Sequence, residues 1–294
     1  MEREIGVVGL GIMGGAMARN LRRAGWRVAG YDPDQAAANA MAAEGIEIVN
    51  DVAALARAVG TVMTSLPSPA ALHATAAAIA GSGMPRRVVI EVSTMTIEDK
   101  LAFEAVLRAA GHVALDCPIS GTGSQAVTKD LVIYASGGAA EIAALRPLFA
   151  DFSRAVHDLG AYGNGSRMKF VANLLVAVHN VASAEAMVLG MKAGLDPHQV
   201  VELIGSGAGT SRVFELRAPM MADNSYEAAT MKCSVWQKDM AIIAKFAAEL
   251  GVPTPMLSAT VPVYNSAMAT GHAAHDTAAV CAVLERMAGI ERPA

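Results

Sequence analysis

The first half of the chain alternates short runs of β-branched residues with Ala-rich stretches of helical length. Alternation of strand and helix is typical of a parallel sheet covered by helices on both faces. We therefore expect an α/β, doubly wound Rossmann domain at the N-terminus. The expected strands are residues 5–8, 27–31, 46–49, 61–66, 87–92, 113–116, 131–136 and 155–158, with helices over 14–24, 35–43, 70–80 and 97–109.

The pattern changes after about Ala161, where the strand signal disappears. The breaker cluster Gly163-Asn164-Gly165 precedes a helical pattern over 166–193, which ends at Gly194 with Pro197 beyond it. Shorter helices are expected over 197–204, 231–250, 257–270 and 274–287. We predict an NAD-binding domain over 1–162 and an all-α substrate and oligomerisation domain over 163–294.

Composition agrees with two globular domains, since 53% of the 294 residues are hydrophobic and only 17% are charged. A formal net charge of −4 and the lack of a Lys/Arg run favour neither a nucleic-acid partner nor a membrane surface. The apolar stretch 171–191 raises the question of a membrane span, but Asn173, His179, Asn180 and Glu185 interrupt it. Such residues are costly in lipid, so we interpret the stretch as a helix buried in protein.

The first residues of the chain and its cysteines indicate in which cellular compartment the protein is expected. Residues 1–4 are mostly charged and lead directly into a short strand, unlike a signal peptide with its longer apolar region. The three cysteines are odd in number and far apart, with neither metal-ligand spacing nor a disulfide framework. We therefore expect a reducing, cytoplasmic location.

A Gly-rich motif follows the first expected strand. The residues Gly9-Leu10-Gly11-Ile12-Met13-Gly14 form G-x-G-x-x-G and open a helix within a βαβ unit. In such a motif the first glycine makes the turn, the second admits the pyrophosphate and the third allows close packing. The anion then rests on the helix N-terminus, where N–H groups are unpaired. The alternative is a tight turn without a ligand.

Asp32 ends the second expected strand, 18 residues after Gly14. A carboxylate there binds the ribose 2′-hydroxyl and repels a 2′-phosphate, which predicts NAD rather than NADP. The alternative is that Asp32 only caps a helix. Other strand ends should line the cofactor as well, namely Leu66-Pro67-Ser68 and Ser93-Thr94, unless these residues serve only as turns.

Lys169 is our candidate for the catalytic acid and base, because removing a hydride from an alcohol requires a group that takes the hydroxyl proton. Asn173 follows four residues later and shares its helical face, with Asn180 near the same stripe. Polar side chains on an otherwise apolar helix need partners if buried. The alternative for Lys169 is a solvated position near the helix start.

A substrate carboxylate also needs hydrogen-bond donors. Ser120, Gly121 and Thr122 follow the sixth expected strand and could present hydroxyls and N–H groups in a nest-like turn. The alternative is a flexible Gly-rich loop.

The sequence resembles the β-hydroxyacid dehydrogenases, the group that contains 3-hydroxyisobutyrate dehydrogenase and tartronate semialdehyde reductase. The resemblance covers essentially the whole chain. Four segments carry it in the right order, namely Gly9–Gly14 with 17–21, residues 116–121, residues 163–173 and Lys238-Asp239-Met240.

The resemblance implies a Rossmann domain, an all-helical domain and an active site between them. It implies a catalytic role for Lys169 with support from Asn173, and carboxylate binding by Ser120 and Gly121. It further implies that Thr94 contacts the nicotinamide half, that Lys238 lies near cofactor and substrate, and that the long helix packs in a homodimer or homotetramer.

Two departures from the family pattern concern the substrate loop. Thr122 stands where the family commonly has a second glycine, and Ser124-Gln125-Ala126 stands where Gly-Ala is frequent. These side chains leave the substrate open but not the type of reaction. Imine-reducing relatives lack the catalytic lysine, so Lys169 indicates the hydroxy acid branch.

Several residues of tempting chemistry are not assigned to the site. His272, His275 and Asp276 lack a nearby further ligand, so we expect no metal, and the resemblance places Asp276 at a structural position. We interpret His179 as a core histidine, and nothing near Cys117 indicates an activated thiolate.

We therefore expect an NAD-dependent oxidoreductase that acts on the hydroxyl carbon of a small hydroxy acid. One rival is an NADPH-dependent reductase of small semialdehydes or ketoacids, which Asp32 disfavours. Another is a non-catalytic dinucleotide sensor, which would not need Lys169.

Overall fold

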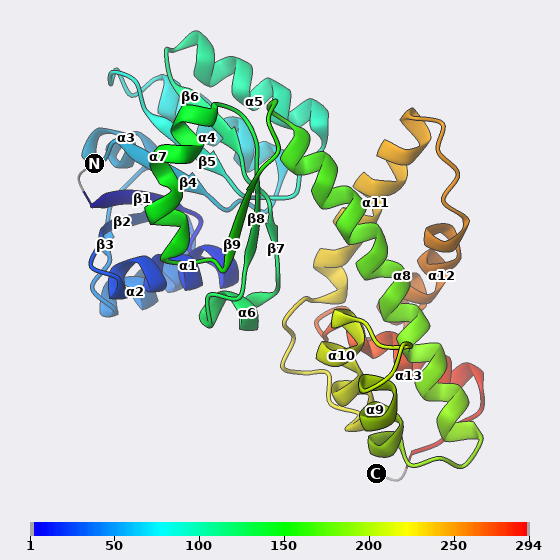
Figure 1. Ribbon diagram of the computed structural model, residues 1–294. Helices are drawn as coiled ribbons and strands as arrows, with labels where there is room; N and C mark the ends of the chain where they lie inside the picture. The colour runs from blue at the N-terminus through cyan, green and yellow to red at the C-terminus, as the bar shows by residue number, and fades with distance from the viewer. Residues whose placement is uncertain (1–2, 293–294) are drawn as a thin grey trace. The chain divides into compact units, whose positions relative to one another are not determined.

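The computed structural model describes residues 3–292 (Figure 1). The chain forms two compact units, Met1–Lys169 and Phe170–Ala294. The division falls within one long helix, which begins in the first unit and continues into the second.

A six-stranded, fully parallel sheet forms the centre of the first unit, with the strand order β3-β2-β1-β4-β5-β6. The order reverses between β1 and β4, and ligands bind beyond the carboxyl ends of the strands at such a switch point. The predicted Rossmann sheet is confirmed. Its strands are β1 (Glu4–Val8), β2 (Arg27–Tyr31), β3 (Glu47–Ile48), β4 (Thr61–Thr64), β5 (Val88–Glu91) and β6 (Val113–Asp116).

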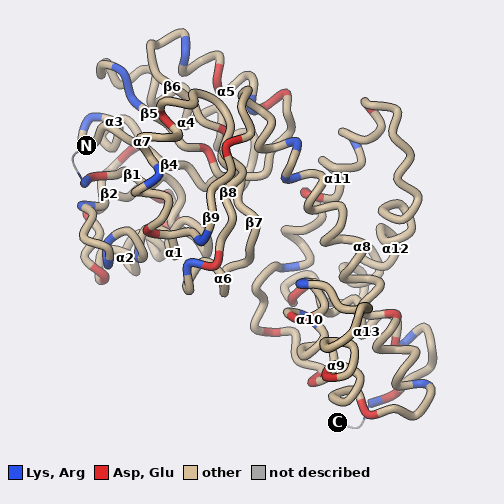
Figure 2. The backbone as a smooth tube through the Cα atoms, viewed as in Figure 1, with Lys and Arg blue, Asp and Glu red and all other residues tan. Residues whose placement is uncertain are grey.

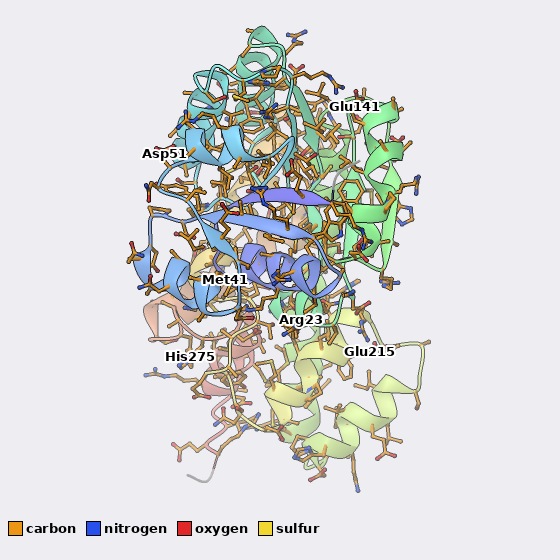
Figure 3. All side chains as sticks on the ribbon, turned by 90° about the vertical axis from the view of Figure 1, so that its left-hand side faces the viewer. Arg23, Met41, Asp51, Glu141, Glu215 and His275 are labelled. Carbon is orange, nitrogen blue, oxygen red and sulfur yellow. The ribbon has the colours of Figure 1, made fainter. Side chains whose placement is uncertain are left out.

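Helices cover both faces of this sheet, and each face has its own apolar core. One core joins the sheet to α1 (Ile12–Arg23), α2 (Gln35–Ala43) and α7 (Ala139–Ala150). The other joins it to α3 (Val52–Ala58), α4 (Pro69–Ala80) and α5 (Ile97–Ala109). Capping side chains fix where α2, α3, α4 and α5 begin, as when Asp51 accepts the N–H of Ala54 at the start of α3 (Figure 3).

The last two strands predicted for the main sheet lie elsewhere. Together with a short strand that we did not predict, they form a three-stranded sheet in the order β7-β8-β9. The strands are β7 (Ile119–Ser120), β8 (Val132–Ala135) and β9 (Ala155–Asp158). Only α6 (Gly123–Val127) connects β7 to β8, which is too short for a parallel crossover, so these two strands pair antiparallel.

All regular elements among the described residues of the second unit are helices, joined by turns and loops, and one isolated β-bridge links Lys232 to Asp276. Helix α10 was not predicted, and the last predicted helix divides into a 3-10 turn and α13. The elements are α8 (Asn164–Lys192), α9 (Pro197–Gly205), α10 (Arg212–Ala222), α11 (Cys233–Glu249), α12 (Pro255–Ala269), η1 (Thr277–Ala279) and α13 (Val280–Met287).

Helix α8 is the one helix within residues 3–292 that is long and apolar enough to cross a membrane. Figure 2 shows its middle free of charged residues. The helix nevertheless buries polar groups inside the second unit, where the Asn180 amide donates to the Tyr264 hydroxyl and the Thr277 carbonyl, both at 2.9 Å. These bonds support the interpretation of α8 as a helix packed against protein.

Asp276 holds together the segments that surround α11 in the second unit. Its carboxylate accepts the N–H groups of Thr230, Met231 and Ala278 and the hydroxyl of Thr230, and it pairs with Arg217 at 3.3 Å. Burial alone would raise the pKa of Asp276, but Arg217 and these donors outweigh burial and hold the pKa below its ordinary value. The residue therefore has a structural task.

Candidate active site

The glycine loop between β1 and α1 has the geometry that a dinucleotide requires. Gly9 has a φ of +89°, and a Cβ atom there would lie 2.0 Å from the carbonyl oxygen of Ser65. A Cβ atom on Gly14 would lie 1.9 Å from the carbonyl oxygen of Gly9. A Cβ atom on Gly11, in contrast, would meet no described atom within 4 Å, so this glycine leaves open space beside the loop.

The N-terminus of α1 borders that open space. Gly11 is the N-cap residue and offers no side chain to bind the first N–H groups of the helix. The first intrahelical bond is donated by Gly15 to Gly11, so the preceding N–H groups have no partner within the helix. A pyrophosphate therefore fits this cradle in both charge and shape.

Asp32 lies where β2 ends and braces the glycine loop. Its Oδ2 atom accepts the N–H of Leu10 at 2.7 Å, and its Oδ1 atom accepts the N–H of Asp34 at 2.8 Å. The cap of α2 is Asp34, which accepts the N–H of Ala36, so the alternative role of Asp32 as a helix cap is wrong. Each carboxylate oxygen of Asp32 has a further lone pair that can accept a ribose hydroxyl.

The loops that follow β4 and β5 are tied to each other. The N–H of Leu66 donates to the hydroxyl of Ser93 at 2.7 Å, and the N–H of Ser93 donates to Glu91 Oε1 at 2.9 Å. Ser68 caps α4 by accepting the N–H of Ala71. The hydroxyls of Ser68 and Ser93 thus both accept backbone N–H groups. Leu66, Pro67 and half-buried Thr94 remain as the candidates for cofactor contact.

The predicted substrate loop has a defined conformation. Ser120 pairs with Val132 in the small sheet. Gly121 has a φ of +141°, and a Cβ atom there would lie 2.5 Å from the side chain of Leu131. The N–H of Thr122 donates to Gln125 Oε1 at 3.1 Å at the start of α6. The Thr122 hydroxyl also has partners inside the loop, Ser124 Oγ at 2.9 Å and Gln125 Oε1 at 3.4 Å, so this hydroxyl must exchange a bond before it can bind a substrate.

The first turn of α8 is fixed to the end of β6. Asp116 accepts the N–H of Ser166 at 2.7 Å and the hydroxyl of Ser166 at 2.8 Å. The N–H of Gly165 donates to the hydroxyl of Ser136 at 2.9 Å. Lys169 follows Ser166 by three residues and is 8% exposed, which argues against the alternative of a solvated lysine.

Asn173 lies one turn beyond Lys169 on α8 and is buried in the second unit. Its Nδ2 atom donates to Asp239 Oδ2 at 3.0 Å, which leaves its Oδ1 atom as an acceptor. Lys238 Nζ lies 3.8 Å from Asp239 Oδ1. The sequence does not single out Asp239 by itself, and its position beside Lys238 in the Lys238-Asp239-Met240 motif is the signal that indicates it.

Two family models cover this chain almost end to end. The NAD-binding domain of 6-phosphogluconate dehydrogenase matches residues 4–160, and the NAD-binding domain of NADP-dependent 3-hydroxyisobutyrate dehydrogenase matches residues 163–284. The chain belongs to the 3-hydroxyisobutyrate dehydrogenase-like family of β-hydroxyacid dehydrogenases. Members of this family are NAD(P)-dependent enzymes that act on CH–OH donors, and this chain is one of them.

Named relatives of this dehydrogenase differ in substrate. L-threonate dehydrogenase of Cupriavidus necator is 30% identical over 100% of this chain and 99% of its own length. NAD-dependent L-serine dehydrogenase of Pseudomonas aeruginosa is 28% identical over 95% of this chain and 96% of its own. The structure of Mycobacterium tuberculosis 3-hydroxyisobutyrate dehydrogenase with L-serine has a TM-score of 0.86 at 27% identity, covering 97% of this chain and 99% of that one.

The contacts and burial of four further residues bear on why they are not assigned to the active site, namely His272, His275, His179 and Cys117. His272 and His275 contact each other through their Nδ1 atoms at 2.9 Å, and no group of three or more possible metal ligands occurs within residues 3–292. His179 is half-buried on α8, so it is not a fully buried core residue as predicted. Burial and the neighbouring Asp116 raise the pKa of the Cys117 thiol, which disfavours a thiolate nucleophile.

Proposed function

We propose that this dehydrogenase uses NAD to oxidise the hydroxyl carbon of a small hydroxy acid similar to 3-hydroxyisobutyrate, with Lys169 as general base. One observation carries the proposal. Lys169 is buried one helical turn beyond Ser166, and Ser166 is bound twice by Asp116 at the end of the strand that leads into the substrate loop.

The proposed cofactor site is built from backbone and carboxylate groups. The free N–H groups at the start of α1 bind the pyrophosphate, and the space beside Gly11 admits it. Asp32 accepts the ribose 2′-hydroxyl and repels a 2′-phosphate, while Leu66, Pro67 and Thr94 line the nicotinamide half. Lys238 is the further residue that we assign to the cofactor, on the ground of the family resemblance. When bound, NAD supplies the acceptor for the hydride.

The proposed reaction breaks one C–H bond and one O–H bond of the substrate. The hydride goes to the cofactor and the proton goes to Lys169. Ser120 and Gly121 bind the substrate carboxylate, with the Thr122 hydroxyl beside them, and the second N–H of the Asn173 side-chain amide donates to the oxygen of the substrate hydroxyl. The Lys169 amine takes the hydroxyl proton as the hydride leaves the same carbon, and a carbonyl forms. In the reverse direction the Lys169 ammonium returns the proton to the carbonyl oxygen.

We also propose that the enzyme is a cytoplasmic homodimer or homotetramer. Helix α8 exposes a row of large apolar side chains, Met168, Val171 and Leu175, which are 38%, 55% and 49% exposed. An apolar face of this kind favours burial against another copy of the chain. All three cysteines are buried and unpaired, in keeping with a reducing compartment.

One screen of substrates with each cofactor tests the proposed function and the proposed cofactor preference together. The purified enzyme is offered 3-hydroxyisobutyrate, glycerate, threonate and serine, each with NAD and with NADP, and reduction of the cofactor is followed by absorbance. We expect turnover of at least one acid with NAD preferred. A preference for NADP would favour the rival semialdehyde or ketoacid reductase, and cofactor binding without any turnover would favour the non-catalytic sensor.

A further inference from the structure

Three charged side chains lie together in the interior of the first unit, and of these only Asp116 belongs to a motif that carries the family resemblance. Glu91 ends β5, Asp116 ends β6, and Lys100 comes from the first turns of α5. All three side chains are 0% exposed. Lys100 Nζ contacts Glu91 Oε2 and lies 3.0 Å from Asp116 Oδ1. We call these residues the buried triad.

The buried triad is connected to the cofactor side of the sheet through Glu91. The Oε1 atom of Glu91 accepts the N–H of Ser93 at 2.9 Å, and the hydroxyl of Ser93 in turn accepts the N–H of Leu66 at 2.7 Å. The loops after β4 and β5, which carry the proposed nicotinamide contacts, are therefore held in register by one end of the triad.

The other end of the buried triad reaches the helix that carries Lys169. Asp116 receives both the N–H and the hydroxyl of Ser166, and a bond of this kind fixes the first turn of α8. The segment just before α8 is also tied to Lys100, because the Tyr162 hydroxyl donates to the Lys100 carbonyl at 3.1 Å. Both the side chain and the backbone of Lys100 thus hold the entry into α8.

Stability alone does not explain such an arrangement. Two carboxylates and one ammonium are removed from water, and a buried ion pair is often no more stabilising than apolar residues of similar size. The geometry has a clearer consequence, since displacing a reacting group by about 1 Å can cost about a hundredfold in rate. A chain of short bonds between two sets of active-site loops is suited to prevent that displacement.

We propose that Lys100 is a positioning residue, which through Glu91 and Asp116 sets the first turn of α8, and hence Lys169, relative to the loops after β4 and β5. The proposal rests on the proposed catalytic role of Lys169. All the contacts that carry it lie within the first unit. Lys100 itself exchanges no proton with the substrate.

Two variants and two matched controls test the proposal. Ser166→Ala removes one hydroxyl bond to Asp116, and Ser153→Ala is its control, because Ser153 is also a buried serine whose hydroxyl donates to a carbonyl, that of Phe149 at 2.7 Å. Lys100→Met removes the buried ammonium, and Arg108→Met removes a 73% exposed cation from the same helix.

We expect Ser166→Ala to lower kcat about tenfold and Lys100→Met about a hundredfold, with an increased deuterium isotope effect because hydride transfer becomes slower. The Kd for NADH, measured by fluorescence, should stay unchanged in Ser166→Ala and in both controls. If Lys100→Met does not fold, Ser166→Ala decides the question. The proposal is overturned if Ser166→Ala behaves like Ser153→Ala, or if it weakens NADH binding while kcat is retained.

Hydrogen exchange separates a failure of this proposal from a failure of the proposed function. If the unmodified enzyme oxidises no acid tested, the function is contradicted, but the positioning can still be measured at the amides of Gly165 and Ser166. We expect these amides to lose protection in Ser166→Ala and Lys100→Met but not in the controls. Unchanged protection would contradict the positioning role whatever the reaction.

Discussion

The Oδ2 atom of Asp32 accepts the N–H of Leu10 at 2.7 Å. This bond joins the end of β2 to the middle of the glycine loop, so the residue proposed to select the cofactor also shapes the turn that binds the pyrophosphate. Substitutions at Asp32 should therefore distinguish the charge of the side chain from its role as an acceptor.

Asp32→Asn should lower the preference for NAD over NADP. The amide oxygen can still accept the N–H of Leu10, but the charge that repels a 2′-phosphate is gone, so the ratio of kcat/KM values should fall about tenfold, equivalent to about 1.4 kcal/mol. Asp34→Asn makes the same charge change two residues away and should leave the ratio unaltered. Equal ratios for the Asp32 variant and the unmodified enzyme would show that Asp32 does not select the cofactor.

Alanine should destabilise the fold at Gly14 but not at Gly11, although both glycines belong to the same loop. Gly14→Ala places a Cβ atom 1.9 Å from a backbone oxygen, so we expect a marked drop in melting temperature. Gly11→Ala meets open space, so the melting temperature should hold while NADH affinity falls, because the methyl group occupies the proposed pyrophosphate site. Normal NADH affinity in a folded Gly11→Ala variant would place the pyrophosphate elsewhere.

The periodic part of the fold could be predicted from the sequence. The main sheet, its glycine turn and the long helix α8 all have strong local patterns, and the predicted 166–193 differs from Asn164–Lys192 by one or two residues at each end. Lys169 and Asn173 could be chosen because polar residues on an apolar helix are conspicuous. Local patterns of this kind need no knowledge of distant contacts.

Features that depend on distant partners could not be predicted. The strands β8 and β9 have the same local character as the core strands, and only the pairing of β8 with two-residue β7 moves them into a second sheet. Helix α10 follows a Gly-rich segment and contains Pro219, which conceals its pattern. The buried triad also depends on distant partners, because it joins residues 91, 100 and 116. The sequence held one signal for it, since two adjacent apolar strands end in acidic residues that need a cation when buried.

Asp276→Asn should destabilise the second unit. It leaves the buried guanidinium of Arg217 without its counter-charge, and breaking a buried pair of this kind costs about 3–5 kcal/mol. Because the folded pKa of Asp276 is depressed, its contribution should be complete above the ordinary carboxyl pKa of 3.8 and lost as the pH falls through the folded value. Urea unfolding at a series of pH values measures both effects.

The exposed Asp223 provides the control for this measurement, since Asp223→Asn removes a carboxylate at the end of α10 that is 57% exposed. Its free energy of unfolding near neutral pH should match that of the unmodified protein. If Asp276→Asn were as stable as this control, the buried carboxylate would not be what holds these segments together.

The central claim is that Lys169 carries the proton in the reaction, and Lys169→Ala tests it most directly. With the best acid from the screen, kcat should fall by about 10²–10⁴-fold while the Kd for NADH stays unchanged, because the amine acts on the hydroxyl and not on the cofactor. Lys245→Ala, at a lysine 53% exposed on α11, should retain full activity. A Lys169→Ala enzyme with near-normal kcat would contradict the mechanism.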